Sequence, residues 1–278
     1  MLFVPTLTVG HISNKCTKCS LRYYRPLTTF LGKRFPSIKS LRFDGLRMTV
    51  DDKQLVTNYF NTVGFERWRK IYSDNEQVNR VQQDIRRGHQ QTVDTILRWI
   101  EEDGDVTQQS FCDAGCGVGS LSIPLAKLGA REVVASDISH AMVKEAQERA
   151  KKEWGGNIPS CLTFNVGDLQ HLQGSFHTVL CVDVLIHYSD DQLGSLLDSL
   201  CRVANNRMII SFAPKTFYYT LLKRIGDFFP GPSKATRAYL HREKDILDAL
   251  QQRGWHATRK HLVKTRFYFS HIVLLKKD

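Results

Sequence analysis

The residues best suited to chemistry are the glycines and acids between positions 110 and 137. Residues 110–120 read Ser-Phe-Cys-Asp-Ala-Gly-Cys-Gly-Val-Gly-Ser. Glycines at alternate positions let the backbone turn sharply and let a ligand lie against bare main chain. Asp137 ends a second apolar run, and its two carboxylate oxygens can accept from both hydroxyls of a ribose. The stretch therefore predicts a site for a nucleotide-like ligand.

The elements that position these residues alternate between strand and helix, which is typical of βαβ units. Two helices are expected late in the chain, over residues 190–204 and 243–253. The predicted fold is α/β, with a Rossmann-like, seven-stranded, mostly parallel sheet that binds its ligand at the carboxyl ends of the strands. Apolar runs predict the seven strands near residues 111–114, 133–136, 161–166, 179–184, 208–212, 255–263 and 266–275.

Two kinds of ligand compete for the glycine pattern. A dinucleotide fold prefers Gly-x-Gly-x-x-Gly, with a pyrophosphate over the helix N-terminus. Here Gly115, Gly117 and Gly119 are spaced Gly-x-Gly-x-Gly, and Asp113 precedes them. This form resembles motif one of the class I S-adenosylmethionine-dependent methyltransferases. The resemblance implies that Asp113 and the glycines hold the methionine end of the cofactor; helix packing and another nucleotide are the alternatives.

A further acid follows the third predicted strand. Asp168 can accept from the amino group of an adenine, or it can serve only as a turn residue. The residues expected to bind the cofactor follow the carboxyl ends of the first four strands. They are Asp113, Gly115, Gly117, Gly119, Asp137, Ile138, Asp168, Leu169 and Asp183.

The segment 48–106 predicts an N-terminal helical arm. Apolar residues at helical spacing predict helices over 51–72 and 76–102, the second interrupted by Gly88 and His89. The first of these is unusually aromatic. Its aromatic side chains either pack on the main domain, which spans 107–278, or form a lid over the cofactor cleft.

Residues 213–240 predict a small cap inserted after the fifth strand. Lys and Arg alternate there with aromatic residues, which suits a flat, apolar ligand carrying carboxylates. The alternative is a cap whose aromatic side chains form their own small core. The candidate substrate-binding residues are Lys215, Phe217, Lys234, Arg237 and Tyr239.

The positive charge of the 278-residue chain is unevenly distributed. Residues 1–47 hold nine Lys or Arg and a single acid, so they carry eight of the eleven net positive charges. This Ser- and Thr-rich leader predicts an organelle transit peptide; a basic tail with another partner is the alternative. The remainder is nearly balanced, so no nucleic-acid groove is expected. No apolar run approaches the roughly 20 residues of a membrane helix, so any membrane association is expected to be peripheral.

Five segments resemble the magnesium-protoporphyrin IX methyltransferases of chlorophyll synthesis, over about residues 51–275. The resemblance implies methyl transfer from S-adenosylmethionine to one propionate of the porphyrin, in a chloroplast, with magnesium entering only as part of the substrate and no metal site. It also implies peripheral contact with plastid membranes and, as a partner, the porphyrin-binding subunit of magnesium chelatase. The segments are Tyr-Phe-Asn-Thr-Val-Gly-Phe-Glu-Arg-Trp (59–68), Asp-Ala-Gly-Cys-Gly-Val-Gly-Ser-Leu-Ser (113–122), Asp-Val-Leu-Ile-His-Tyr (183–188), Ser-Phe-Ala-Pro-Lys-Thr (211–216) and Phe-Pro-Gly-Pro-Ser-Lys (229–234).

The resemblance implies catalytic roles for two residues. Tyr72 matches the position that closes over the cofactor, and His187 matches a histidine after the fourth strand. We expect His187 to orient the propionate and to titrate near its ordinary pKa of about 6.5. It could instead contact the magnesium or satisfy a loop carbonyl. A porphyrin-binding module without activity, and a methyltransferase acting on a quinone or another small acid, are the alternative functions.

Overall fold

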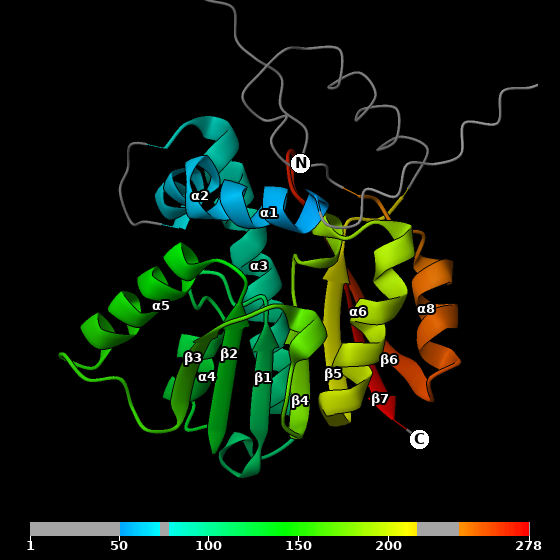
Figure 1. The fold of residues 1–278 in the computed structure, drawn as a ribbon. Coiled ribbons are helices and arrows are strands. Elements are labelled where there is room, and N and C mark those ends of the chain that lie inside the picture. Colours follow the sequence, from blue (N-terminus) through cyan, green and yellow to red (C-terminus); the bar gives the residue numbers. More distant parts are fainter. Residues whose placement is uncertain (1–50, 73–77, 216–238, 278) are drawn as a thin grey trace, which may run out of the picture.

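The computed structural model describes residues 51–72, 78–215 and 239–277. Over these residues a seven-stranded sheet has the order β3-β2-β1-β4-β5-β7-β6 (Figure 1). Strands β1 to β5 pair with one another in parallel, whereas β7 is antiparallel to both β5 and β6. The strand bounds are β1 Ser110–Ala114, β2 Glu132–Asp137, β3 Leu162–Val166, β4 Phe176–Cys181, β5 Ala204–Phe212, β6 Trp255–Lys264 and β7 Phe269–Lys277. The mostly parallel α/β sheet predicted from the sequence is confirmed.

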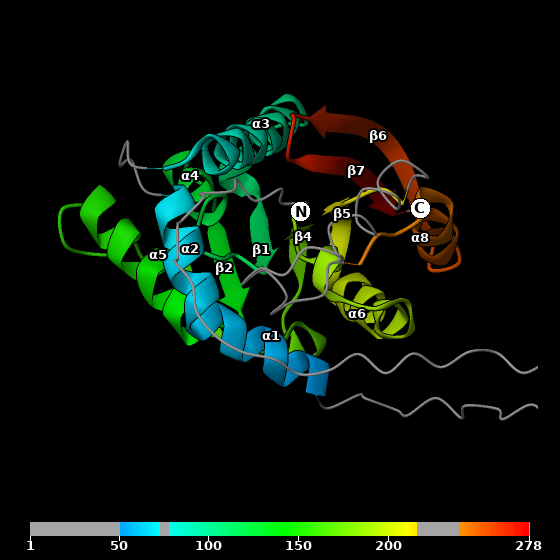
Figure 2. The same cartoon turned by 90° about the horizontal axis from the view of Figure 1, so that it is seen from above.

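Helices cover both faces of the sheet, and alternate strand residues supply the two cores. Phe111 packs with residues of α3, α4 and α5, while the neighbouring Cys112 packs with residues of α6 and α8 on the other face. Figure 2 shows α3 and α6 on opposite sides of the sheet. The bounds are α3 Arg80–Glu102, α4 Ser122–Lys127, α5 His140–Glu153, α6 Asp190–Val203 and α8 Glu243–Gln251. Burial on both faces explains why the central strands read as continuous apolar runs.

The single helix expected over 51–72 is wrong, because the structure has two helices there. They are α1 (Asp51–Asn61) and α2 (Val63–Tyr72). The hydroxyl of Thr62, the residue after α1, donates to the Asn58 carbonyl in the last turn of that helix at 2.7 Å. A Cβ atom on Gly64 would lie 2.5 Å from Tyr59 Cε1, so only glycine permits this close turn. Figure 1 shows α1 and α2 lying across one edge of the sheet.

The expected interruption of the second helix is also wrong. Helix α3 begins at a capping box, in which the Asn79 side chain accepts from Gln82 N at 2.9 Å and the Gln82 side chain accepts from Asn79 N at 3.1 Å. It then continues through Gly88 and His89. A Cβ atom on Gly88 would lie 2.4 Å from Tyr268 Cδ1, so the glycine makes room for the tyrosine ring.

The fourth strand ends earlier than expected. Strand β4 stops at Cys181 rather than at Val184, and Asp183 adopts a φ of 58°. No other non-glycine residue in the described ranges has a positive φ. Such a conformation ends strand pairing and turns the next residues across the top of the sheet. None of the helices in these ranges has the length and apolarity needed to cross a membrane.

Candidate active site

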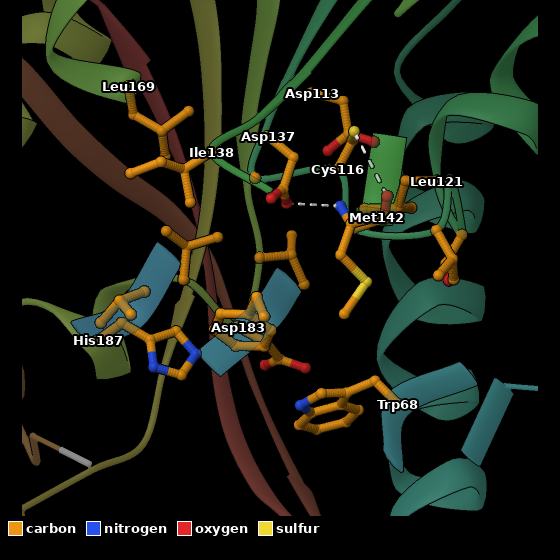
Figure 3. A pocket seen from close by; sticks show the side chains of 18 of the residues that line it. Trp68, Asp113, Cys116, Leu121, Asp137, Ile138, Met142, Leu169, Asp183 and His187 are labelled. Carbon is orange, nitrogen blue, oxygen red and sulfur yellow. Dashed lines mark hydrogen bonds between the residues drawn. The ribbon is translucent and has the colours of Figure 1, made fainter. Parts of the chain in front are cut away.

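A pocket lies at the carboxyl ends of β1, β2 and β4, beneath α1 and α2. Residues of the glycine loop form one wall, and residues after β2 and β4 form the others (Figure 3). Val56 and Phe60 of α1 and Trp68 of α2 complete the lining. The pocket is thus where ligands bind in open α/β sheets, and the predicted arm lies against it.

The glycine loop has the conformation that its sequence predicts. Gly115, Gly117 and Gly119 have φ values of 85°, 52° and 82°. A Cβ atom on Gly115 would lie 2.2 Å from Val184 Cγ2, so this position requires a bare backbone. A Cβ atom on Gly117 would meet nothing within 4 Å, because the position faces open space. The loop can therefore approach a ligand through its main chain.

Asp137 is oriented by the backbone on both sides of the pocket. Its Oδ2 accepts from Gly117 N at 3.0 Å, and its Oδ1 accepts from Ser139 N at 2.8 Å. Burial raises the pKa of this carboxyl, against the effect of the two backbone hydrogen bonds. Each oxygen keeps a second acceptor site. The carboxylate can therefore accept from two neighbouring ribose hydroxyls without losing its backbone support.

Asp113 lies deeper than Asp137. Its side chain is buried, and its Oδ2 accepts from the Ser122 hydroxyl at the start of α4. Burial raises the pKa of Asp113 to about 6, and the Asp137 charge adds to this, while the hydrogen bond from Ser122 opposes it. Sequence reasoning did not identify Ser122 as a partner of Asp113, because a serine at the start of a helix is usually a capping residue.

Some of the residues after β2 and β3 line the pocket, and others stabilise the loops around it. Ile138 and Leu169 line the pocket, whereas Asp168 is not among its lining residues. The Asp168 carboxylate instead caps the short helix Leu169–His171, accepting from Gln170 N at 3.0 Å. The geometry favours the turn-residue alternative for Asp168 and leaves its contact with adenine a prediction.

Asp183 lines the pocket and accepts from residues of three different elements. His89 Nδ1 lies 3.1 Å from Oδ2, and the Tyr268 hydroxyl donates to the same oxygen at 2.6 Å. Ser211 and Ser270 donate to Oδ1 at 3.0 and 3.1 Å. Sequence reasoning missed His89 and Tyr268, although a Gly-His pair inside a helical pattern is a signal of close packing.

His187 lies in a short helix, Leu185–His187, directly after the β4 loop. Its ring lies edge-on to Phe60 of α1, and it lines the pocket. Its Nδ1 is buried, and no described residue forms a hydrogen bond with it. Burial lowers the pKa of His187 to about 4, so the imidazole is neutral at neutral pH. The expected titration of His187 near pH 6.5 is therefore wrong, because desolvation disfavours the imidazolium.

Hydrogen bonds tie the arm to the rim of the pocket. The Ser139 hydroxyl lies 3.1 Å from the Phe60 carbonyl and 2.8 Å from Asn61 Oδ1. Asn61 Oδ1 also accepts from Ala141 N at 3.3 Å, so the end of α1 is tied to the start of α5. This supports the lid alternative for the arm. Tyr72 is the last residue of α2, and its side chain lies outside the described part of the structure.

Both ends of the predicted cap meet beside His187. Lys215 is exposed, and its backbone N donates to the His241 carbonyl at 2.8 Å. Tyr239 is half-buried, and its N donates to the Ile186 carbonyl at 2.8 Å. Neither residue lines the pocket. The other candidate substrate-binding residues, Phe217, Lys234 and Arg237, lie outside the described residues, as does the predicted leader 1–47.

The acidic side chains that line the pocket are not balanced by Lys or Arg among the described lining residues. Three carboxylates line it, those of Asp113, Asp137 and Asp183. No Lys or Arg is found among the lining residues in the described part of the chain. Within the same ranges no group of three or more His, Cys, Asp or Glu is arranged to hold a metal ion. The pocket is therefore suited to a ligand that carries positive charge.

Comparisons with known proteins agree with this geometry. A family model described as magnesium-protoporphyrin IX methyltransferase C-terminus matches residues 181–277, and a methyltransferase domain model matches residues 111–207. The chain is 53% identical over 223 residues to the chloroplastic magnesium protoporphyrin IX methyltransferase of Arabidopsis thaliana, covering 80% of this chain and 70% of that one. It is 52% identical over 225 residues to the magnesium-protoporphyrin O-methyltransferase of Synechocystis, covering 81% and 96%.

A solved structure adds the cofactor. The crystal structure of the magnesium protoporphyrin IX methyltransferase of Synechocystis with bound S-adenosylhomocysteine aligns with a TM-score of 0.74 at 49% identity, covering 82% of this chain and all of that one. The class I methyltransferase fold, the S-adenosylmethionine cofactor and the resemblance found in the sequence are confirmed. The chain belongs to the magnesium-protoporphyrin IX methyltransferase family.

Proposed function

We propose that this chain transfers the methyl group of S-adenosylmethionine to a propionate carboxylate of magnesium protoporphyrin IX, giving the monomethyl ester. The observation that carries the proposal is the meeting of the glycine loop, Asp137 and His187 in one pocket. This pocket belongs to a chain 52% identical to the Synechocystis O-methyltransferase. The three carboxylates on its walls suit a cationic methyl donor.

The reaction requires no general base. A propionic acid has a pKa near that of Glu, about 4.3, so the acceptor is already ionised at neutral pH. When bound, S-adenosylmethionine supplies an electrophilic methyl group, whose bond to sulfur breaks as a carboxylate oxygen bonds to the carbon. The electron pair of the broken bond stays on sulfur, and no proton moves. The protein must therefore orient the carboxylate and exclude water.

His187 is suited to orienting the acceptor. Because burial lowers its pKa to about 4, the ring is neutral and can form a hydrogen bond without adding positive charge. Its unpartnered Nδ1 is a buried polar atom that a ligand can satisfy. Phe60 of α1 packs edge-on against the half-buried ring. Tyr72, at the end of the arm, is proposed to assist closure over the cofactor.

The positive charges that attract the porphyrin are proposed to come from the cap. The described lining of the pocket has no Lys or Arg, whereas the segment 213–240 is rich in both. Both ends of that segment meet next to the His187 loop, through Tyr239 N and His241. Lys215, Phe217, Lys234, Arg237 and Tyr239 remain the candidate substrate-binding residues.

We also propose a chloroplast location. The basic leader 1–47 is proposed to be a plastid transit peptide, followed by the arm 48–106 and the methyltransferase domain 107–278. The name of the chloroplastic Arabidopsis relative supports this location. The stroma, with peripheral contact to envelope or thylakoid membranes, and an association with the porphyrin-binding subunit of magnesium chelatase are further proposals.

The test is an incubation with methyl-labelled S-adenosylmethionine and magnesium protoporphyrin IX. We expect the label in a porphyrin monomethyl ester, identified by chromatography and mass spectrometry. A parallel incubation with a quinol and with a simple aliphatic acid tests the alternative acceptors. A protein that binds the cofactor yet forms no porphyrin ester, while it methylates one of the other acceptors, would contradict the proposal.

A further inference from the structure

The carboxylate of Asp183 is saturated with hydrogen-bond donors. Oδ2 accepts from His89 and Tyr268, and Oδ1 accepts from Ser211 and Ser270. An ionised carboxylate has about four lone-pair sites, and here each has a protein donor. This contrasts with Asp137, whose oxygens each hold a single backbone donor. Asp183 therefore has no acceptor site left for a ligand hydroxyl or amine.

The main chain of Asp183 is held as firmly as its side chain. Its φ of 58° is disfavoured for a side-chain-bearing residue, and its N donates to Ser211 Oγ at 2.9 Å. The donors come from α3, β5, β7 and the loop before β7, so the carboxylate is fixed from several sides. Strained backbone that surrounding structure holds in place is common at functional sites. The arrangement keeps a carboxylate on the pocket wall.

A saturated carboxylate acts on a ligand through its charge. Burial by itself raises the pKa of Asp183, but the hydrogen bonds from His89, Tyr268 and Ser211 hold it below its usual range. Burial instead raises the pKa values of Asp113 and Asp137. Asp183 is thus the pocket carboxylate that the protein most strongly maintains as an anion.

The sheet order places this anion opposite the ribose site. Strand β1 lies between β2, which ends at Asp137, and β4, which precedes Asp183. The apolar Leu169 follows β3, on the outer side of β2. A nucleoside whose ribose lies on Asp137 and whose base lies toward Leu169 directs its 5′ substituent across β1, toward β4. In S-adenosylmethionine the sulfur is attached there through a single methylene group. Figure 3 shows Asp137, Asp183 and His187 around the same pocket.

We infer that Asp183 is the residue by which the pocket distinguishes the cationic methyl donor from its neutral product. The inference rests on the proposed function. A sulfonium gains from a nearby fixed anion, whereas the thioether formed after transfer does not. The anion would therefore favour binding of the donor over retention of S-adenosylhomocysteine. Because its lone pairs are occupied, Asp183 is also kept from competing with the substrate carboxylate as a methyl acceptor.

The test compares the affinities of S-adenosylmethionine and S-adenosylhomocysteine by calorimetry. Asp183→Asn removes the charge, and Asn tolerates a positive φ well. We expect this variant to bind the donor about tenfold more weakly and the product with almost unchanged affinity, so the affinity ratio changes about tenfold, which is worth about 1.4 kcal/mol. Asp183→Gly, which also suits the backbone, is the second neutral variant if the first fails to fold.

Ser270→Ala is the matched control, because it removes one donor and keeps the charge. Its donor-to-product ratio should stay within about threefold of wild type even if its melting temperature falls. Equal weakening of both ligands in the neutral variants would make Asp183 a purely structural residue and overturn the inference, as would unchanged affinities. If wild-type protein bound neither ligand, the proposed function itself would fail, which is a separate result.

Discussion

The ring of Phe60 on α1 lies edge-on against the imidazole of His187, with ring centroids 5.1 Å apart and the planes at 84°. The two residues are far apart in sequence, and the contact links the arm to the loop after β4. Because Ser139 holds the Phe60 carbonyl, the same segment of α1 is also tied to the rim of the cofactor pocket. Coverage of His187 therefore depends on the position of the arm.

Removing Phe60 should expose His187. In Phe60→Ala the burial that lowers the pKa of His187 to about 4 is reduced, so the pKa should rise toward its ordinary value of about 6.5. NMR titration of the His187 ring measures this shift. Leu262→Ala, at an exposed apolar position on β6, is the control and should leave the titration unchanged. An unshifted pKa in Phe60→Ala would mean that the arm does not control the burial of His187.

His187→Ala should affect turnover more than cofactor binding. Loss of an orienting hydrogen bond that misplaces the acceptor by about 1 Å can cost on the order of a hundredfold in kcat. The Kd for S-adenosylmethionine should change little. Because the pKa of His187 is about 4, the pH–rate profile of the wild type should show no change near pH 6.5 that comes from titration of this residue. Steady-state kinetics across pH check both points, and near-normal turnover in the variant would exclude the orienting role.

Asp137→Ala and Asp168→Ala should differ in their effect on the cofactor. Asp137 lines the pocket with free acceptor sites, so its loss should weaken S-adenosylmethionine binding by at least tenfold, or about 1.5–3 kcal/mol. Asp168 is not among the lining residues and caps the short helix Leu169–His171, so its loss should cost less than about threefold in cofactor affinity. Calorimetry on the two variants provides the comparison. Similar losses at both positions would instead indicate that Asp168 contacts the adenine.

Binding of the cationic cofactor should expel a proton from Asp113 at mildly acidic pH. Burial raises the pKa of this carboxyl to about 6, so it is ionised above that pH and protonated below it. A bound cation favours the ionised form, so affinity should be maintained above about pH 6 and fall as the pH drops through it. Calorimetry in buffers of different ionisation enthalpy measures the released proton. If the Asp113→Asn variant still released a proton on binding the cofactor, the proton would come from another group.

Asp113 also makes the free energy of unfolding depend on pH, and the sign of this dependence is opposite to that of a salt-bridged acid. Its pKa is raised above the ordinary value of 3.8, so the folded state binds the proton more tightly than the unfolded state. The contribution of Asp113 to the free energy of unfolding of the ligand-free protein therefore increases as pH falls from about 6 toward 3.8. Asp113→Asn should remove this contribution, which denaturant titrations at pH values within that window measure.

The sequence by itself determined the parts of this protein that depend on local chemistry. Gly115, Gly117 and Gly119 predict a turn with a backbone conformation that favours glycine, and their positive φ values in the structure agree with this prediction. Alternating apolar runs and turn residues predict parallel strands whose carboxyl ends share one edge, which places Asp137 near the glycine loop. These features can be predicted from the sequence because backbone sterics and strand periodicity act between near neighbours along the chain.

Only the tertiary structure decided which groups share one environment. His89 meets Asp183 across 94 residues and Tyr268 meets it across 85, and no periodicity connects them. The strand order, with β7 inserted between β5 and β6, brings Ser270 to the same carboxylate. Burial in the folded chain likewise lowers the pKa of His187, and the ring that lies edge-on to it belongs to Phe60, which is distant in sequence. Desolvation and long-range hydrogen bonds arise from packing between distant segments, which a linear pattern of residue types does not encode.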